Sequence, residues 1–322
     1  MILVIGEALI DLIGEAGSGG SYTAVVGGAN ANVALALAVR GEDQRFLGRI
    51  SADGFGKQIA AHLSSYGVDL SLTVDATEQT TLAVATIDAK GVASYSFYTK
   101  DTADWGWTAD ELPTAETVQS LSTKAIQYGC LGMAIEPGNL VIEAWLKSFF
   151  EAQSVTLSHD LNIRPALGFD RESELERVLR LNDQSHIIKA SDADIEWLYG
   201  LEEGTDLNEI AFEWSYGKLV VVTKGPDGVS LYRDGERIDV AGQKVNLVDT
   251  VGAGDTFMAN LLGELSALDA LGDKPASRLA RLSNDELVAA ASVANLAAGI
   301  VCERTGCQPP TRFEIETKSS AD

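Results

Sequence analysis

Four consecutive residues, Gly252, Ala253, Gly254 and Asp255, lie where an extended run ends and a segment with helical spacing of apolar residues begins. A glycine-rich turn that opens a helix predicts an anion site, because the first N–H groups of a helix lack partners and the helix dipole adds partial positive charge. A carboxylate in such a turn would repel a bound phosphate, so Asp255 indicates a proton acceptor beside a phosphoryl group. The three residues before it would donate N–H groups to the charge that develops during transfer. The alternative interpretation is an acid that only caps the helix.

Four strings in the sequence share one resemblance. Residues 249–257, Asp-Thr-Val-Gly-Ala-Gly-Asp-Thr-Phe, resemble the C-terminal signature of the ribokinase-like (PfkB) family of carbohydrate kinases. Residues 27–34 look like that family's Gly-Gly sugar-binding motif, and residues 48–56 look like its next glycine-rich turn. Residues 160–165, Asp-Leu-Asn-Ile-Arg-Pro, are similar to a run found in fructokinase-like members. Asn30 departs from the family pattern, which has Gly, Ala or Pro at that position.

The resemblance implies an α/β, ribokinase-like three-layer fold with a mostly parallel central sheet flanked by helices and a small β-sheet lid. The motifs follow the family's order along most of the chain, so we expect residues 1–322 to form a single kinase domain. No linker, low-complexity tract or internal repeat argues for two domains.

The 322 residues include 24 basic and 47 acidic side chains, for a formal net charge of −23. Such a surface repels nucleic-acid phosphates and anionic lipids, so neither a nucleic acid nor a membrane is expected as a partner. It also repels a free nucleotide, so a phosphate site must be built from local donors and a divalent metal. The short, uncharged apolar start and the lack of a membrane-length apolar run predict a cytoplasmic protein. The three cysteines lack paired metal spacing and are interpreted as buried or incidental thiols.

Short apolar runs alternate with segments of helical periodicity, as in a parallel sheet that is covered on both faces. The predicted strands are residues 2–5, 44–47, 125–128, 155–158, 186–189 and 219–223, and the predicted helices are residues 31–39, 57–66, 140–150, 173–181, 192–198 and 284–301.

Two stretches, residues 16–26 and 80–98, break the alternation, and we expect them to pair as a small β layer over the site. Residues 88–91 would form a hairpin turn within the second stretch. In the family that the chain resembles, this layer is the lid and in some members a dimer interface, so a homodimer through the lid is a possible assembly. Gly6 follows the first predicted strand without the further glycines of a dinucleotide-binding turn, which disfavours a Rossmann dehydrogenase.

Residues near the N-terminus are candidates for holding a sugar. Asp11 follows the first predicted strand at the carboxyl end of the sheet, where open α/β sheets bind ligands, and could accept hydrogen bonds from two hydroxyls. Taken alone it is only a loop acid, and the match to the family's corresponding aspartate favours the sugar site. Gly27 and Gly28 would let the backbone approach the sugar, and Asn32 offers a donor and an acceptor to hydroxyls. Its alternative role is at the helix cap.

Asn162 and Arg164 follow a predicted strand in the middle of the chain. Arg164 could bind a sugar oxygen or the transferring phosphate, with Asn162 at the same edge of the sheet. A surface salt bridge is the alternative for Arg164. Tyr98 of the lid is a further candidate sugar contact, although packing within the lid is the default use of an aromatic residue there.

The resemblance also implies a nucleotide site, with Asn295 placed beside adenine. A buried amide satisfied by backbone is the competing interpretation of Asn295. Lys189 could reach nucleotide phosphate from a strand end. The predicted nucleotide contacts are Lys189, Thr223, Gly225, Gly228, Gly254 and Asn295.

ATP would bind with Mg²⁺. Ser191 and Asp194 stand where many members carry Asn and Glu to organise magnesium, and the shorter Asp194 could act through water. A serine N-cap with first-turn acids explains the segment equally well. Asp249 matches a position near a monovalent cation loop in many members, which would bring K⁺, and its alternative role is an Asx turn.

These features predict an ATP-dependent kinase that phosphorylates a primary hydroxyl of a small sugar, with fructose to fructose 6-phosphate as the first choice. Other substrates within the same family are 2-keto-3-deoxygluconate and nucleosides. The alternative from another class of protein is a catalytically silent sensor of sugar or nucleotide, against which the intact Gly-Ala-Gly-Asp turn argues.

Overall fold

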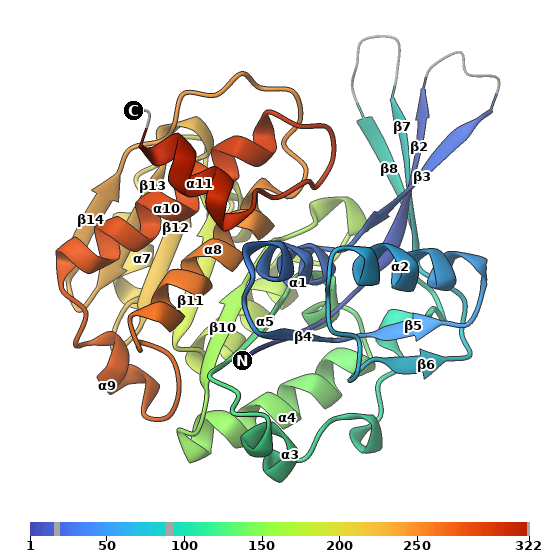
Figure 1. Ribbon diagram of the computed structural model, residues 1–322, viewed down its shortest axis with the longest axis horizontal. Coiled ribbons are helices and arrows are strands. Elements are labelled where there is room, and N and C mark those ends of the chain that lie inside the picture. Colours follow the sequence, from blue (N-terminus) through green and yellow to red (C-terminus); the bar gives the residue numbers. More distant parts are fainter. Residues whose placement is uncertain (16–19, 88–92, 321–322) are drawn as a thin grey trace.

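An eight-stranded sheet forms the centre of the computed structural model, which describes residues 1–15, 20–87 and 93–320 (Figure 1). The strand order is β14-β13-β12-β11-β10-β9-β1-β4. All neighbours from β12 to β4 run parallel, whereas β13 and β14 form an antiparallel edge. In chain order the strands are β1 (Ile2–Ile5), β4 (Gln44–Leu47), β9 (Ala125–Gly129), β10 (Thr156–Asp160), β11 (Ile187–Ser191), β12 (Leu219–Thr223), β13 (Val229–Arg233) and β14 (Glu236–Val240).

Helices cover both faces of this sheet, as near-continuous apolar strands require. One face packs against α1 (Ala29–Arg40), α2 (Gly54–Ser65), α8 (Ala253–Ala267) and α10 (Asn284–Cys302). The other face packs against α4 (Gly138–Ala152), α5 (Arg171–Asp183), α6 (Asp192–Tyr199) and α7 (Asn208–Trp214). The remaining helices are the short α3 (Ala115–Ser120) and α9 (Pro275–Leu279) and the C-terminal α11 (Arg312–Ser319).

A second, four-stranded sheet projects away from the main sheet at the upper right of Figure 1. It consists of β3 (Tyr22–Gly27), β2 (Leu9–Glu15), β7 (Leu82–Ile87) and β8 (Ala93–Tyr98), in that order, and we call it the lid. β5 (Arg49–Ser51) and β6 (Val74–Ala76) pair separately near its base. The connection from β1 to β2 and the start of α1 after β3 lie at the carboxyl ends of β1 and β9.

The expected alternation of strands and helices is confirmed, with shifts of a few residues at element ends. Two local expectations are wrong. The run before Gly252 contains no strand, because residues 241–252 cross the surface as an irregular connection. Asp11 does not lie in a loop after β1 but inside β2, where it pairs with Val25 of β3 and Ala83 of β7. The turn expected at residues 88–91 and the start of the stretch 16–26 lie outside the described residues.

One described helix, α10, is long and apolar enough to cross a membrane by composition, but 56% of the tested window is buried. α10 packs against α8 in the main core, which is the ordinary position of an apolar helix in an α/β fold.

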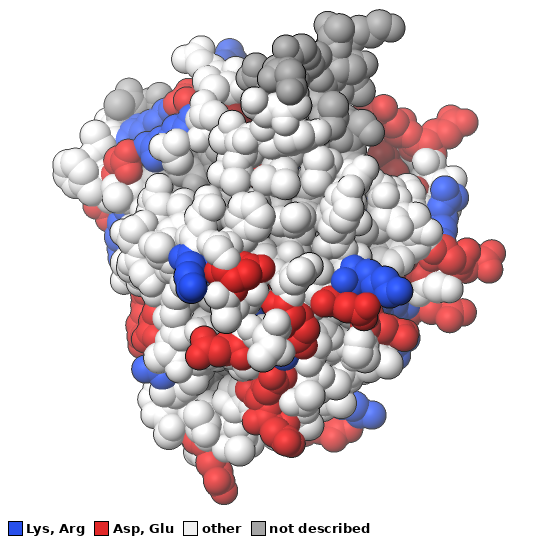
Figure 2. All heavy atoms as spheres, turned by 90° about the vertical axis from the view of Figure 1, so that its right-hand side faces the viewer, with Lys and Arg blue, Asp and Glu red and all other residues white. Residues whose placement is uncertain are grey.

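The face shown in Figure 2 carries acidic side chains over its lower half, with fewer and scattered basic ones. Together with the net charge of −23, this arrangement means that the overall field repels anions. An anionic substrate must therefore be held by donors gathered at one place.

Candidate active site

The helix α8 begins at Gly252, an N-cap residue with a left-handed φ of 79°. A side chain there would clash, because a Cβ would lie 2.4 Å from the sulfur of Cys307. Ala253 donates its N–H to the carbonyl oxygen of Thr250 at 3.2 Å, so this predicted donor is already engaged within the turn. The N–H groups of Gly252 and Gly254 form no hydrogen bond to another described residue. They remain available at the positive end of the helix.

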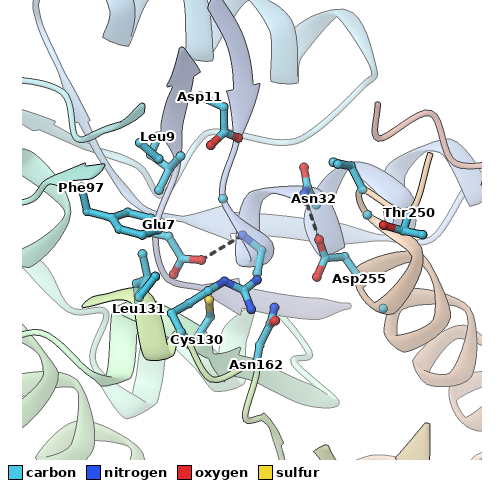
Figure 3. A pocket seen from close by; sticks show the side chains of 18 of the residues that line it. Glu7, Leu9, Asp11, Asn32, Phe97, Cys130, Leu131, Asn162, Thr250 and Asp255 are labelled. Atoms are coloured by element: carbon cyan, nitrogen blue, oxygen red, sulfur yellow. Dashed lines mark hydrogen bonds between the residues drawn. The ribbon is translucent and has the colours of Figure 1, made fainter. Parts of the chain in front are cut away.

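Asp255 lies in the first turn of α8 and is 7% exposed. Its Oδ2 accepts a hydrogen bond of 2.8 Å from Nδ2 of Asn32 in α1 (Figure 3). Burial raises the pKa of Asp255 to about 7, against the effect of the Asn32 hydrogen bond. Among neighbouring charges, Asp160 raises this pKa further, whereas Lys189 and Arg164 lower it. A carboxylate tuned to near neutrality can accept a proton and later release it.

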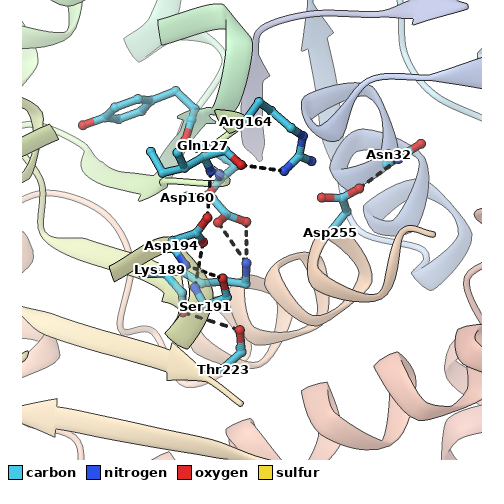
Figure 4. A network of polar contacts seen from close by, with 12 residues as sticks. Asn32, Gln127, Asp160, Arg164, Lys189, Ser191, Asp194, Thr223 and Asp255 are labelled. Atoms are coloured by element: carbon cyan, nitrogen blue, oxygen red, sulfur yellow. Dashed lines mark hydrogen bonds and ion pairs between the residues drawn. The ribbon is translucent and has the colours of Figure 1, made fainter. Parts of the chain in front are cut away.

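A buried ion pair lies below this carboxylate (Figure 4). Lys189 Nζ lies 2.9 and 2.8 Å from the two oxygens of Asp160 on the neighbouring strand. Burial alone would lower the pKa of Lys189, but Asp160 outweighs that effect and the pKa is raised. The ammonium lies 3.4 Å from the position that a Cβ of Gly254 would take. A fixed positive charge therefore stands beside the α8 turn.

A cavity of about 420 Å³ opens between the lid and the carboxyl ends of the central strands. Its polar wall includes Asp11, Asn32, Asn162, Arg164 and Asp255, which come from the lid, α1, the segment after β10 and α8. An apolar wall faces them. It consists of Leu9, Ala83, Phe97, Cys130 and Leu131.

A second cavity of about 310 Å³ adjoins the first. Thr250 and Gly254 line both cavities, so the start of α8 lies at their junction. The second cavity contains most of the predicted nucleotide contacts, namely Thr223, Gly225, Gly228, Gly254 and Asn295. Lys189 is the exception, because it lines the first cavity instead.

Asp11 and Arg164 set the polarity of the first cavity. Burial raises the pKa of Asp11 to about 6, and the charge of Arg164 opposes that rise. The guanidinium donates to the carbonyl oxygen of Ile163 at 3.2 Å. Gly27 leaves room for the carboxylate of Asp11, because a Cβ at Gly27 would lie 2.1 Å from Asp11 Oδ2. Gly28, not Gly27, lines the cavity itself.

Two predicted sugar contacts need correction. Tyr98 is 61% exposed and does not line the cavity, whereas its neighbour Phe97 does. Side chains alternate between the faces of a strand, so only one of the two can point inward. Asn32 lines the cavity as expected, but its amide nitrogen donates to Asp255 and so orients the carboxylate.

The two predicted metal residues both bind backbone. Asp194 accepts from the N–H of Ile163 and of Ser191, each at 2.8 Å, and forms a capping box with Ser191 at the start of α6. Asp249 accepts from the N–H of Val251 at 3.1 Å, the expected Asx turn, and from that of Gly306 at 2.8 Å. These bonds correspond to the alternative interpretations of both residues, and a metal would have to use their remaining lone pairs.

Sequence reasoning missed Glu7, which lines the first cavity and is 1% exposed. An acid directly after a buried strand was the available signal, because a carboxylate is rarely buried without several donors. Cys130 and Leu131 were also missed as lining residues, since apolar side chains in a short 3₁₀ segment carry no chemical signature.

Comparisons with known proteins agree with this geometry. The family described as pfkB family carbohydrate kinase matches residues 1–313. Fructokinase from Rhizobium leguminosarum bv. trifolii is 36% identical over 273 residues, which cover 82% of this chain and 79% of the relative.

Two solved structures share the fold. Fructokinase with bound ATP from Xylella fastidiosa has a TM-score of 0.87 at 23% identity and covers 100% of this chain and 99% of its own. Fructokinase from Vibrio cholerae O395 in its fructose, ADP and calcium ion bound form has a TM-score of 0.80 at 24% identity, with coverages of 98% and 97%. The predicted ribokinase-like fold is confirmed.

The raised pKa of Asp255 predicts a pH-dependent effect of Asp255→Asn on stability. The folded-state pKa of about 7 lies above the ordinary aspartate pKa of 3.8. The folded chain therefore retains a proton that the unfolded chain releases, and wild-type stability falls as pH rises from about 4 to 7. Asn has no carboxyl group to ionise in the buried site. The free energy of unfolding of the variant should therefore exceed that of wild type by at least about 1 kcal/mol at pH 8. Urea unfolding should show a much larger advantage at pH 8 than at pH 4.5, and an equal effect at both would contradict the assignment.

Proposed function

This chain belongs to the pfkB family of carbohydrate kinases and is an ATP-dependent carbohydrate kinase, and we propose that its acceptor is the primary hydroxyl of fructose, with fructose 6-phosphate as product. The observation that carries the proposal is that the Asp255 carboxylate lines the first cavity directly after Gly254, which lines both cavities, and beside N–H groups that form no hydrogen bond to another described residue. The first cavity supplies acceptors and donors suited to hydroxyls, and the second suits a nucleotide. The identity to a fructokinase over most of the chain supports the choice of sugar.

The proposed reaction uses each of these groups once. As the sugar hydroxyl oxygen bonds to the γ-phosphorus, its proton passes to Asp255, and the bond from phosphorus to the β,γ-bridging oxygen breaks to release ADP. The N–H groups of Gly252 and Gly254 stabilise the charge on the transferring phosphoryl oxygens. The Lys189 ammonium adds positive charge at the same place, so we assign it to the transferring γ-phosphoryl group and not to the α- or β-phosphate of the nucleotide. Asp255 then returns its proton to water.

Mg²⁺ bound with ATP would neutralise phosphate charge in this site. Among residues 1–15, 20–87 and 93–320 there is no group of three or more His, Cys, Asp or Glu side chains that could hold a metal ion. This fits an ion that is held mainly by phosphate oxygens and water, with Asp194 in contact through water. The calcium ion in the Vibrio cholerae structure supports a divalent ion. K⁺ near the Asp249 turn is a further element of the proposal.

The lid edges support an assembly of two copies. Tyr22 on β3 and Tyr98 on β8 are 49% and 61% exposed, and these two strands are the outer strands of the lid sheet. Exposed aromatic side chains on edge strands favour pairing with another copy. We include a homodimer through the lid in the proposal.

A coupled assay of ADP release over fructose, other hexoses, 2-keto-3-deoxygluconate and nucleosides tests the choice of substrate. The highest kcat/KM is expected for fructose, with phosphate on the primary hydroxyl by NMR. A higher kcat/KM for a nucleoside or for 2-keto-3-deoxygluconate would replace fructose in the proposal, and no turnover of any substrate would support the sensor.

Removal of the proposed general base should prevent phosphoryl transfer without preventing the binding of sugar and ATP. Asp255→Asn keeps the size of the side chain but lacks proton affinity, so turnover should fall by at least about 100-fold. Calorimetry should still detect sugar and ATP binding. Asp192→Asn, which changes a first-turn acid of α6 outside both cavities, is the matched control. Near-normal turnover of Asp255→Asn would rule out its proposed role.

Sugar affinity should depend on Asp11. Asp11→Ala leaves a hydroxyl without its acceptor in a buried cavity, so sugar binding should weaken by roughly 1 to 3 kcal/mol while ATP binding stays the same. Asp75→Ala, at an exposed position of β6, controls for the loss of an acid elsewhere. Calorimetry that showed weaker ATP binding with unchanged sugar binding would mean that the two cavities are assigned in reverse.

The lid should close when sugar binds, because water would otherwise compete for the γ-phosphate. Hydrogen exchange of the lid amides in residues 20–27 and 82–87 should slow at saturating fructose. α7, none of whose residues lines either cavity, serves as an internal reference that should not change. Equal exchange in the lid with and without sugar would show that the lid does not respond to substrate.

A further inference from the structure

Glu7 binds the whole first turn of α1. Its Oε1 accepts from the N–H of Ala29 at 2.9 Å and of Asn30 at 3.4 Å, and its own carbonyl oxygen accepts from the N–H of Ala31 at 3.3 Å. The N-cap residue, Gly28, has no side chain for this purpose. A carboxylate from another element therefore caps α1 and complements its dipole.

The second carboxylate oxygen of Glu7 ties α1 to the sheet. Oε2 accepts from Nδ2 of Asn30 at 2.9 Å and from the N–H of Gly132 at 3.0 Å. The same amide nitrogen of Asn30 also donates to the carbonyl oxygen of Gly129 at 3.1 Å. Asn30 stands where the family pattern has Gly, Ala or Pro, none of which has a side-chain donor. The departure thus gives this chain a second anchor between α1 and the end of β9.

The turn that Glu7 holds also carries Asn32, whose Nδ2 donates to Asp255 at 2.8 Å. An unbroken set of contacts runs from Glu7 through the first turn of α1 to the proposed base. All four acceptor contacts of the Glu7 carboxylate are with protein donors, so its role is not explained by sugar binding.

We propose that Glu7, assisted by Asn30, is a positioning residue that fixes Asn32 and thereby orients the Asp255 carboxylate toward the acceptor hydroxyl. The inference rests on the proposed role of Asp255. Under this proposal Glu7 differs from an ordinary buried helix cap, because removal of Glu7 must change the chemistry of Asp255 as well as the stability of the chain.

The expected change in the pKa of Asp255 has a definite direction. The Asn32 hydrogen bond lowers the pKa of Asp255 against burial, so a displaced Asn32 should raise that pKa. The charged and titratable groups that face Asp255 are Asp160 from β10, Lys189 from β11, Arg164 from the segment after β10, and the thiols of Cys130 and Cys307. Glu7 also acts by its charge on Arg164 and on Cys130. Loss of that charge in Glu7→Gln opposes the expected rise, so Asn30→Ala, which keeps the charge of Glu7, measures the effect of a displaced Asn32 separately.

Glu7→Gln tests the proposal, because it keeps the shape of the side chain but turns an amide donor toward N–H groups. We expect kcat to fall by at least about 10-fold and KM for ATP to stay within about twofold. The acid limb of the kcat/KM profile should move up by about half a pH unit or more. Thr311→Ala, which removes the N-cap of the remote α11, should lower stability without moving the acid limb. An unmoved acid limb in Glu7→Gln would reduce Glu7 to a structural cap.

A double-mutant cycle between Glu7→Gln and Asn32→Ala tests whether Glu7 acts on Asp255 through Asn32. If Glu7 acts through Asn32, the double variant should have nearly the kcat of Asn32→Ala alone, and additive losses would overturn the proposal. Asn30→Ala provides the same readouts with a milder change if Glu7→Gln does not fold.

Hydrogen exchange of the amides of residues 29–32 requires no substrate and should be faster in Glu7→Gln than in wild type. The cycle is run with whichever sugar the wild-type enzyme phosphorylates. A failure of fructose as substrate would therefore refute the proposed function alone. Unchanged exchange at residues 29–32 would refute the role of Glu7 alone.

Discussion

The structure depends on keeping one carboxylate, Asp255, buried at the positive end of a helix. A group in that position must be accessible to substrate, ionisable near neutrality and held in one orientation, while burial disfavours its charge. The surrounding residues meet these demands separately. Asn32 gives a hydrogen bond, and Lys189 and Arg164 give positive charge, whereas Asp160 neutralises part of that charge.

The two helices that point at the first cavity begin in opposite ways. At α1 the first-turn N–H groups are occupied by Glu7, whose charge complements the helix dipole. At α8 the N–H groups of Gly252 and Gly254 have no hydrogen-bond partner in the described part of the chain. In a protein with a net charge of −23, an anion is drawn only to the open helix end. The proposed function therefore assigns phosphate to the start of α8 and the neutral sugar to the lid side of the cavity.

Sequence patterns predicted the fold well, because buried parallel strands and amphipathic helices have distinct periodicities. The turn at Gly252 to Asp255 was found for the same reason, since a glycine-rich helix start is a local property. The roles of Asn32 and Lys189 were not predicted in full, because each is decided by a partner from a distant part of the chain, namely Asp255 and Asp160.

Other differences have equally local causes. Tyr98 and Phe97 are adjacent, and only the phase of β8 decides which one faces the cavity. Asp11 lines the first cavity but lies in a strand and not in the expected loop, because β2 follows β1 after a three-residue connection that has no strong turn signal. Glu7, within that connection, offered no recognisable motif although it holds the start of α1.

The most direct measurement is a ¹³C NMR titration of the Asp carboxyl carbons in wild-type protein and in Asp255→Asn, each without ligand. The resonance that is lost in the variant reports Asp255. The account predicts that this resonance titrates with a pKa near 7, as burial in the site requires. A pKa close to that of a free aspartate, about 4, would show that the carboxylate is not held in the buried environment on which the proposed mechanism depends.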